Sequence, residues 1–263
     1  MPVLPIVLFI NLGVGSTSVI YRYKSTKLSS INPKAVFDLM NKYKVNQVIS
    51  SPSFITSLSN YAMKIGNYPI IVSSIYTGGA PVFPKEAKLF AAAFPKAHIE
   101  VIYGSTEAEP ISAVPVQELI ASEGKQKGLL VGFPDSSAEV KIIPFCDEVI
   151  EVDDDEALET CPQGEIGEII VAGNHVLTAY FNNPEALRRA KIWHGPKMYY
   201  RTGDSGYFDE LGRLFLVGRS SQAIVVEDEV IYPFIFEDEL QGIEGVKRGT
   251  ILKRDERVFV VVE

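Results

Sequence analysis

Residues 103–107, with the sequence YGSTE, combine residue types that can bind a nucleotide phosphate. They follow an apolar stretch with the character of a strand. A Gly-Ser-Thr turn at the carboxyl end of a strand exposes backbone N–H groups and a hydroxyl group to a phosphate oxygen. The carboxylate of Glu107 can hold Mg²⁺ against the same phosphate, and the ring of Tyr103 offers a flat face to a base. Taken alone, the segment fits a plain turn with a glutamate in solvent equally well.

Three further segments carry residues of similar chemistry. In residues 200–204, YRTGD, the carboxylate of Asp204 can accept two hydrogen bonds from a ribose diol, or it can cap a turn at the end of a strand. The guanidinium of Arg219, which follows Gly218, can reach a ribose or a phosphate. Residues 78–81, GGAP, begin with two residues that lack Cβ atoms, so that a planar ring can lie against the backbone; a tight turn explains them equally well.

The order of these four segments along the chain is more specific than any one of them. The sequence resembles the adenylate-forming (AMP-binding) superfamily of acyl-CoA synthetases, luciferases and peptide-synthetase adenylation domains. The resemblance covers nearly the whole chain and rests on GGAPV, YGSTEAEPIS, GEIGEIIVAG and YRTGDSGYFDELGRLFLVGR. Within the superfamily, the sequence is similar to the olefin β-lactone synthetase, or fatty-acid-CoA ligase-like, branch through SPSFITSL, VGFPDSSAEVKIIP and YFNNPEALRRAKI.

The resemblance implies a role for each matching residue. Gly78, Gly79 and Ala80 would line an adenine pocket, Tyr103 would stack on the base with Gly104 in the same nucleotide-binding turn, Thr106 would hydrogen-bond the α-phosphate, Glu107 would coordinate Mg²⁺, Asp204 would hold the ribose hydroxyls and Arg219 would assist. Thr106 and Glu107 are therefore the expected catalytic residues, and Glu107 is the expected metal ligand. Ser221 occupies the position of the family's hinge between domains, where Asp or Lys is usual.

The implied activity is that of an ATP-dependent, AMP-forming acid ligase. The carboxylate of a fatty or β-hydroxy fatty acid attacks the α-phosphate of ATP and gives acyl-AMP and pyrophosphate, while Mg²⁺ and oriented donors stabilise the charge. A nucleophile then displaces AMP: a thiol in CoA ligases, or the substrate's own β-hydroxyl in the β-lactone branch. Internal attack gains from proximity, with effective molarities that reach about 10⁵ M or more. The expected ligands are ATP or AMP and Mg²⁺, and CoA is a doubtful co-substrate.

Parts of the family pattern have no match in the sequence. The Ser/Thr/Gly-rich loop that ends in Pro-Lys and grips the β- and γ-phosphates is missing; residues 13–18, GVGSTS, lack the lysine and lead into a predicted strand. The catalytic lysine of the small domain would lie beyond Glu263, and the glycine near the pantetheine path is not evident around residues 227–230. We therefore expect a partial chain, with a missing N-terminal segment of the same enzyme as a candidate partner.

The elements that position these residues follow from hydrophobic periodicity and turn residues. Helices are predicted over residues 33–44, 53–65 and 84–94, and strands over residues 46–50, 70–76 and 98–103. This alternation predicts a mostly parallel sheet covered by helices. Beyond residue 129, a small antiparallel barrel or sandwich is predicted from short strands at residues 138–143, 168–172, 198–200 and 213–217, with a helix at residues 184–191.

The predicted fold class is α/β. We expect part of an adenylate-forming large domain, in which a parallel sheet with helices is joined to a small β-barrel subdomain, followed by the start of a small α+β C-terminal domain. The predicted boundaries are residues 1–128 for the partial α/β subdomain with the adenine and phosphate motif, residues 129–218 for the β-rich subdomain with Asp204, and residues 219–263 for the truncated start of the mobile C-terminal domain.

Composition limits the class of protein and its ligands. The 263 residues are 46% hydrophobic and 22% charged, which is typical of a globular protein and excludes disordered and fibrous classes. A net charge of −8, from 25 basic and 33 acidic residues, excludes general attraction to nucleic acid or to anionic membranes. The only two cysteines, Cys146 and Cys161, exclude a disulfide scaffold and indicate a reducing compartment, so we expect a cytoplasmic protein.

Two segments have a plain structural interpretation. Residues 1–20 are mostly apolar but lack the basic start of a signal peptide, and prolines, glycines and an asparagine interrupt any spanning helix. We predict no transmembrane span there, but a buried helix leading into a strand at residues 17–23. Arg188, Arg189 and Lys191 form a small basic group, which we predict to be the solvated face of a helix.

Two functions from different classes remain open from the sequence. The first is the AMP-forming ligase, which predicts release of pyrophosphate from ATP with a long-chain acid. The second is a catalytically inactive nucleotide-binding or interaction fragment of such an enzyme, which the missing loop and lysine favour. It predicts AMP binding without turnover, or no nucleotide binding at all.

Overall fold

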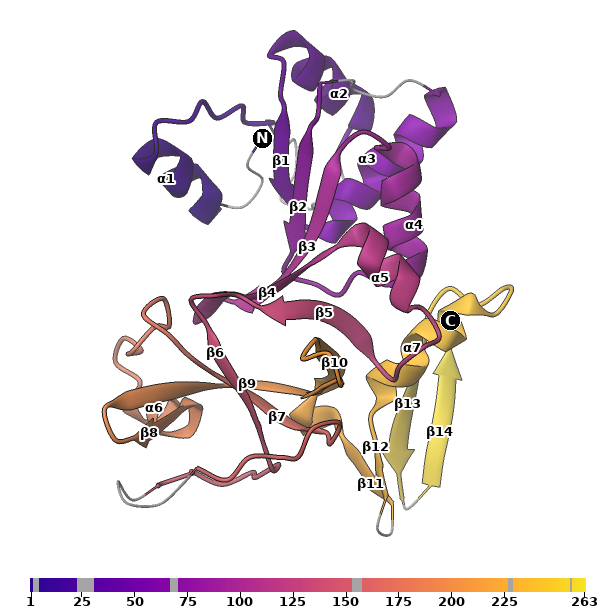
Figure 1. Cartoon of the computed structure of the whole chain (residues 1–263). Helices are drawn as coiled ribbons and strands as arrows, with labels where there is room; N and C mark the ends of the chain where they lie inside the picture. Colours follow the sequence, from indigo (N-terminus) through magenta and orange to yellow (C-terminus); the bar gives the residue numbers. More distant parts are fainter. Residues whose placement is uncertain (2–4, 23–30, 67–70, 153–157, 227–228, 256) are drawn as a thin grey trace. The chain divides into compact units, whose positions relative to one another are not determined.

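The computed structural model describes residues 1, 5–22, 31–66, 71–152, 158–226, 229–255 and 257–263. The chain divides into two compact units (Figure 1): unit 1 comprises residues 1–103 and 113–123, and unit 2 comprises residues 104–112 and 124–263. The division falls within two strands, β3 (His98–Ser105) and β4 (Ala108–Pro115). Among the described residues, no helix has both the length and the apolar character needed to cross a membrane.

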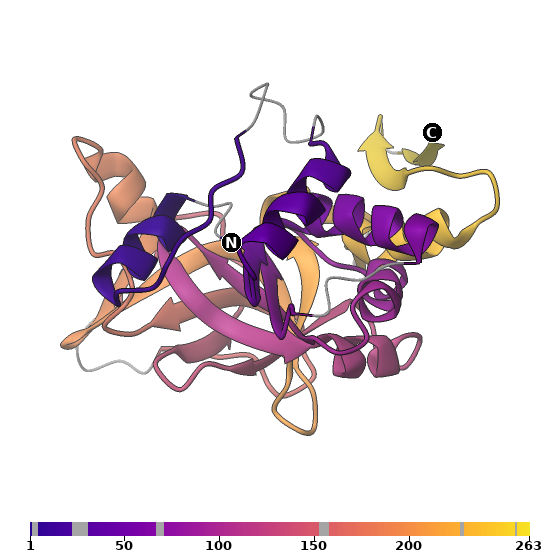
Figure 2. The same ribbon diagram turned by 90° about the horizontal axis from the view of Figure 1, so that it is seen from above.

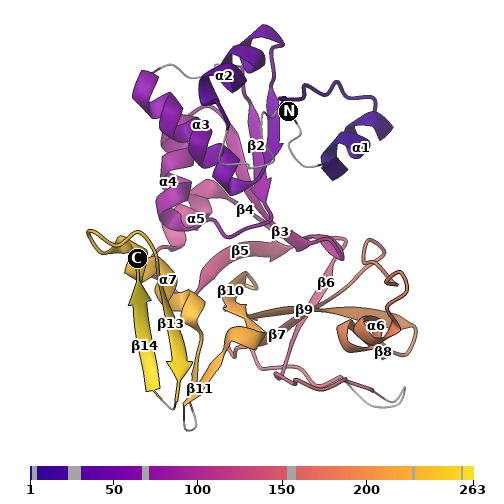
Figure 3. The ribbon, with the colours of Figure 1, turned by 180° about the vertical axis from the view of Figure 1, so that it is seen from behind.

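Unit 1 is built on three parallel strands. β1 (Gln47–Ser50) pairs with β2 (Ser74–Gly78), and β2 pairs with β3. The buried residues Val48, Ile75 and Ile99 occupy matching positions of these strands. Four helices lie along one side of the strands (Figures 1 and 3): α2 (Pro33–Lys42), α3 (Pro52–Ile65), α4 (Pro84–Ala93) and α5 (Val116–Ser122). The intervening helices make parallel pairing feasible, because each returns the chain to the same end of the sheet.

Local signals set the ends of these helices. Pro33 is the first residue of α2, and the side-chain oxygen of Asn32 accepts a hydrogen bond of 3.2 Å from the N–H of Ala35. α3 ends at Gly66, whose left-handed φ of 61° lets its N–H bond the carbonyl of Ala62. Because proline and asparagine start a helix and glycine ends one, the sequence pattern places these helices within a few residues of their observed bounds.

Unit 2 contains an antiparallel sheet with the strand order β5 (Leu129–Pro134), β10 (Leu214–Arg219), β9 (Lys197–Phe208), β7 (Gly167–Ala172) and β6 (Glu139–Ile143). A short strand, β8 (Lys191–His194), follows helix α6 (Pro184–Ala190) and pairs with the start of β9. β9 is thus paired with β10, β7 and β8, and it carries the predicted ribose-binding motif.

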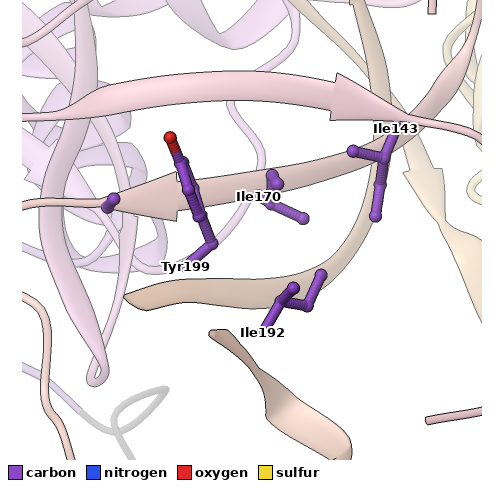
Figure 4. Packing of buried hydrophobic residues seen from close by; sticks show 5 residues of the cluster. Ile143, Ile170, Ile192 and Tyr199 are labelled. Carbon is purple, nitrogen blue, oxygen red and sulfur yellow. The ribbon is translucent and has the colours of Figure 1, made fainter. Parts of the chain in front are cut away.

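One face of this sheet carries a hydrophobic cluster (Figure 4). Ile170 of β7, Ile192 of β8 and Tyr199 of β9 are fully or almost fully buried there, together with Ile143 and Ala172. Successive side chains of a strand point to opposite faces, so Tyr200 and Thr202 lie on the face away from this cluster.

The last part of unit 2 consists of short elements. A 3₁₀ turn (Ser220–Gln222) is followed by a hairpin of β11 (Ile224–Val226) and β12 (Glu229–Ile231). Helix α7 (Pro233–Gly242) then packs against β10 and against β13 (Gly249–Arg254), which forms a second hairpin with β14 (Arg257–Val262). Ser221, at the predicted hinge position, lies in the 3₁₀ turn.

The α/β fold class is confirmed, with parallel helix-covered strands first and antiparallel strands later. The predicted burial of the first helix is wrong: α1 (Pro5–Gly13) buries only Val7, and Phe9 is 68% exposed. In Figures 1 and 3, α1 lies on the other side of the strands from α3 and α4, and Figure 2 shows it apart from these helices. Residues 17–22 form no strand, and residue 23 lies outside the described residues. The predicted domain boundaries at residues 128 and 218 stay predictions.

We expect Ile170→Ala to destabilise the chain by about 2–5 kcal/mol, because the substitution removes a fully buried side chain from the cluster and leaves a cavity. The free energy of unfolding in urea measures this effect. Leu211→Ala, at an exposed position, is the matched control and should change stability by less than about 0.5 kcal/mol. Equal losses in both variants would contradict the assignment of the core.

Glu139 makes stability depend on pH. Hydrogen bonds from Lys197 and Tyr199 hold the pKa of its carboxyl below the ordinary value of 4.5. A carboxyl with a lowered pKa in the folded state adds stability above pH 4.5, and this contribution is lost as the pH falls through the folded-state pKa. The wild-type chain should therefore melt at a higher temperature than Glu139→Gln at about pH 6. This difference should shrink as the pH falls towards roughly 3, where the Glu139 carboxyl becomes protonated. Parallel profiles would contradict this role.

Candidate functional site

Glu107 lies in the two-residue turn between β3 and β4 and is held there by two contacts within unit 2. Its backbone carbonyl accepts a hydrogen bond of 2.8 Å from the N–H of Leu177, and its Oε1 atom accepts one of 3.0 Å from the hydroxyl of Tyr180. Thr106, the other residue of the turn, is exposed. The turn therefore presents a hydroxyl and an oriented carboxylate, the two groups that the sequence predicts at a phosphate.

Lys191 lies close to this carboxylate, at the first position of β8. The register of the hairpin places it opposite Tyr200 of β9, with its Nζ atom 4.4 Å from the centre of the Tyr200 ring and 5.8 Å from the Tyr180 ring. The residue is only 4% exposed, and in the described structure Nζ has no hydrogen-bond partner. A buried ammonium thus faces two aromatic rings beside Glu107.

Burial changes the protonation of these side chains. It raises the pKa of Tyr180, and the hydrogen bond to Glu107 acts in the same direction. It lowers the pKa of the Lys191 ammonium, whereas the negative charge of Glu107 acts against this change. Tyr180 therefore remains neutral near pH 7, and the Glu107 charge favours the charged form of Lys191.

Asp204 is positioned by β9 and its neighbour β10. Its N–H donates a hydrogen bond of 3.0 Å to Thr202 Oγ1, and its Oδ1 atom lies 3.2 Å from Nη1 of Arg219, the residue opposite it on β10. Nη1 of Arg219 also donates to the carbonyl of Thr202 at 3.1 Å. Gly203 between them has a φ of 70°, a conformation that other residues rarely adopt, which explains the glycine in the motif.

Tyr200 connects the two groups of residues. Burial raises the pKa of its hydroxyl; the charges of Glu107 and Asp204 also raise this pKa, while that of Arg219 lowers it. All three charged side chains therefore lie within electrostatic range of one ring. Within unit 2, the structure brings together Glu107, Asp204 and Arg219, which are far apart in the sequence.

The remaining predicted residues belong to unit 1, apart from Gly104. Gly78 ends β2 beside Ile102 of β3, and a Cβ atom on it would lie 2.5 Å from the Ile102 carbonyl oxygen. Gly79 follows with a φ of 80°, and Ala80 comes next in the same bend. Tyr103 and Gly104 are the residues of β3 at which the two units divide. The glycine at position 78 is thus required by the close approach of two backbones, whether or not a ring lies against it.

The candidate site suits Mg²⁺ only if a bound nucleotide supplies most of the metal ligands. In the part of the chain that the structure describes, no group of three or more His, Cys, Asp or Glu residues could hold a metal ion. Mg²⁺ commonly keeps several waters and is held by one or two carboxylates together with substrate phosphates. Glu107, with Oε1 oriented by Tyr180, suits this arrangement, in which the nucleotide supplies most of the remaining ligands.

Sequence reasoning missed Tyr180 and Lys191. The prediction that Arg188, Arg189 and Lys191 share a solvated helix face is wrong for Lys191, because α6 ends at Ala190 and β8 turns the lysine inward. The two arginines are exposed, as predicted. The signal for Lys191 was its place before the apolar Ile-Trp pair, which is typical of a strand. Residues 227–228, part of the expected pantetheine path, lie outside the described residues.

Comparison with known proteins decides the family. Residues 4–181, more than half of the chain, match the family described as AMP-binding enzyme. The chain belongs to the AMP-binding enzyme family. This AMP-binding chain is 30% identical over 241 residues to the olefin β-lactone synthetase of Xanthomonas campestris pv. campestris, covering 88% of the chain and 42% of that protein. It is 28% identical over 261 residues to the olefin β-lactone synthetase of Stenotrophomonas maltophilia, covering 96% of the chain and 46% of that protein. The chain thus spans less than half the length of these curated relatives.

Solved structures of adenylate-forming enzymes share the fold of the AMP-binding chain. The unliganded O-succinylbenzoate coenzyme A synthetase from Bacillus subtilis has a TM-score of 0.75 at 23% identity, covering 97% of this chain and 50% of that one. The same enzyme in complex with ATP and magnesium ion has a TM-score of 0.73 at 23% identity, covering 97% and 47%. The predicted adenylate-forming fold is therefore confirmed.

Thr202 should be essential for the local structure of the site. Its buried hydroxyl donates to the Ile169 carbonyl at 2.8 Å and accepts from the Asp204 N–H. Thr202→Val removes both bonds without a large change of shape, and we expect the free energy of unfolding to fall by about 1–3 kcal/mol. Thr202→Ser keeps the hydroxyl and serves as the control. Urea denaturation measures both variants, and a valine variant as stable as the serine variant would contradict this role.

Proposed function

We propose that this chain binds ATP and AMP, and that it is part of an enzyme that activates a fatty or β-hydroxy fatty carboxylate as an acyl-adenylate. The observation that carries the proposal is the pair of oriented carboxylates in unit 2: Asp204, held 3.2 Å from Arg219, and Glu107, held by the hydroxyl of Tyr180 at 3.0 Å. Unit 2 thus carries a carboxylate suited to Mg²⁺ and a carboxylate suited to ribose hydroxyls, and a bound nucleotide monophosphate requires both.

Each residue then has a defined task towards the nucleotide. Asp204 accepts hydrogen bonds from the ribose hydroxyls, and Arg219 holds the Asp204 carboxylate in place and reaches towards the ribose or phosphate. Thr106 donates to the α-phosphate. The bend from Gly78 to Ala80, the ring of Tyr103 and the backbone of Gly104 receive the adenine. Glu107 is the residue that would hold Mg²⁺, which when bound neutralises charge on the phosphate oxygens.

The proposed reaction has two steps. A carboxylate oxygen of the acid forms a bond to the α-phosphorus while the bond to the pyrophosphate oxygen breaks, giving acyl-adenylate and pyrophosphate. The β-hydroxyl oxygen then attacks the acyl carbon, the bond to AMP breaks, and the hydroxyl proton is released. The two olefin β-lactone synthetases among the relatives support this internal nucleophile, whereas a relative named putative acyl–CoA ligase, 32% identical over 223 residues, fits the thiol of CoA. The fatty character of the acid, like a cytoplasmic location, is part of the proposal.

A second function is nucleotide binding without turnover. It is favoured by one observation: the Gly/Ser/Thr-rich residues 13–18 carry no following lysine that could grip the β- and γ-phosphates. An additional segment of the same enzyme, which corresponds to the rest of these relatives, is the partner that the ligase function requires. Under the second function the chain binds AMP but releases no pyrophosphate.

The substitution Glu107→Gln tests the metal-binding role of Glu107 without disrupting the fold. We expect pyrophosphate release from ATP, measured with a β-hydroxy fatty acid and Mg²⁺, to fall about 100-fold, because a charged group that stabilises the transferring phosphoryl group is lost. The fold should survive, since glutamine can still accept the hydrogen bond of Tyr180.

Glu109→Gln is the matched control for this measurement, because Glu109 is exposed and lies two residues further along β4. It should leave the rate unchanged. A Glu107→Gln variant as active as the wild-type chain would remove Glu107 from the proposed role. A wild-type chain that binds AMP and releases no pyrophosphate even when the additional segment of the enzyme is supplied would favour the second function.

A further inference from the structure

Lys191 is a buried cation to which neither the family resemblance nor the proposed reaction assigns a role. It is 4% exposed, and its Nζ atom has no hydrogen-bond partner among the described residues. An ammonium group has three N–H donors, and a buried charge without partners is strongly unfavourable. The unpaired ammonium therefore raises the free energy of the folded chain. A ligand that accepts its hydrogen bonds would remove this destabilisation.

The surroundings of Lys191 supply part of the missing stabilisation. The rings of Tyr200 and Tyr180 lie 4.4 Å and 5.8 Å from Nζ, within the range of cation–π attraction. The ring faces favour the positive charge and provide no oxygen acceptor for the three N–H groups. The positive charge of Lys191 is thus buried at a position where none of the described residues accepts a hydrogen bond from it.

The position of Lys191 relative to Glu107 indicates where the missing acceptor belongs. Tyr180 contacts both residues, through its hydroxyl at 3.0 Å from Glu107 Oε1 and through its ring near Lys191 Nζ. The Glu107 charge acts on Lys191, yet no ion pair joins the two in the described structure. Their opposite charges therefore face the same region without neutralising each other directly.

We propose that the Lys191 ammonium donates to an anionic phosphate oxygen of the nucleotide, beside the oxygen that a metal on Glu107 would neutralise. This inference rests on the proposed function. A phosphate suits the pair better than a carboxylate does, because it offers several anionic oxygens at once. An attacking carboxylate must also keep one oxygen free for the reaction. Lys191 is thus a phosphate-binding residue, and Tyr180 and Tyr200 position it.

The test compares AMP with adenosine, which lacks the phosphate. Isothermal titration calorimetry on the full chain should give an AMP affinity that is about 10- to 100-fold weaker for Lys191→Met, because a charge-assisted hydrogen bond is lost. The adenosine affinity should stay the same, which a merely structural role of Lys191 would not produce. Lys191→Arg keeps the charge and should recover part of the AMP affinity.

Lys197→Met is the matched control, because Lys197 is an exposed lysine in the same β8–β9 hairpin. It should leave both affinities unchanged. Thermal unfolding should show that Lys191→Met is at least as stable as the wild-type chain, since an unpaired buried charge is removed. If Lys191→Met weakens the binding of AMP and of adenosine to the same extent, Lys191 acts through the structure and the inference is overturned.

The outcomes separate this inference from the proposed function. If the wild-type chain binds AMP and Lys191→Met binds it equally well, the inference fails and the proposed function stands. If ATP binding weakens and AMP binding does not, the lysine contacts a β- or γ-phosphate oxygen instead, and the inference that Lys191 binds the AMP phosphate is overturned. A wild-type chain that binds neither nucleotide would overturn both.

Discussion

The pairing of β9 with three other strands is the constraint on which the candidate site depends. Its register places Lys191 of β8 opposite Tyr200 and Arg219 of β10 opposite Asp204. Strand geometry then sends Tyr199 to the hydrophobic cluster and Tyr200 to the other face. A shift of one residue in this register would exchange the two faces, moving the residues of the candidate site to the core face and exposing the core. The stability of the cluster and the geometry of the site are therefore set by the same backbone.

Two cations near β9 illustrate the difference between structural and binding residues. Arg201 and Glu168 are 10% and 4% exposed and form a buried ion pair at 2.6 Å. The other donors of Arg201 reach the backbone carbonyls of Cys146 and Glu148, so that this guanidinium is satisfied within the fold. Lys191 is buried to a similar degree and has no such partners among the residues that the structure describes. The first pair holds β7 to β9, whereas the free donors of Lys191 are the reason why we propose that it contacts a ligand.

Much of the fold could be predicted from the sequence, because local signals coincide with the final structure. Asparagine and proline at the start of α2 and glycine after α3 mark the helix ends, and short apolar runs between turn residues mark the strands of unit 2. The exposure of α1 could not be predicted, since the apolar character of residues 5–13 indicates that the helix favours an apolar partner but not that the described chain provides one. The motifs led to Glu107, Asp204 and Arg219. Lys191 and Tyr180 escaped prediction because their importance arises from long-range pairing rather than from spacing.

A crystal structure of the full chain grown with AMP tests the central claim most directly. The account predicts AMP with its ribose hydroxyls on Asp204, its phosphate next to Thr106 and Glu107, and a phosphate oxygen within hydrogen-bond distance of Lys191 Nζ. AMP bound at a different place, or with its phosphate directed away from Glu107 and Lys191, would contradict the account.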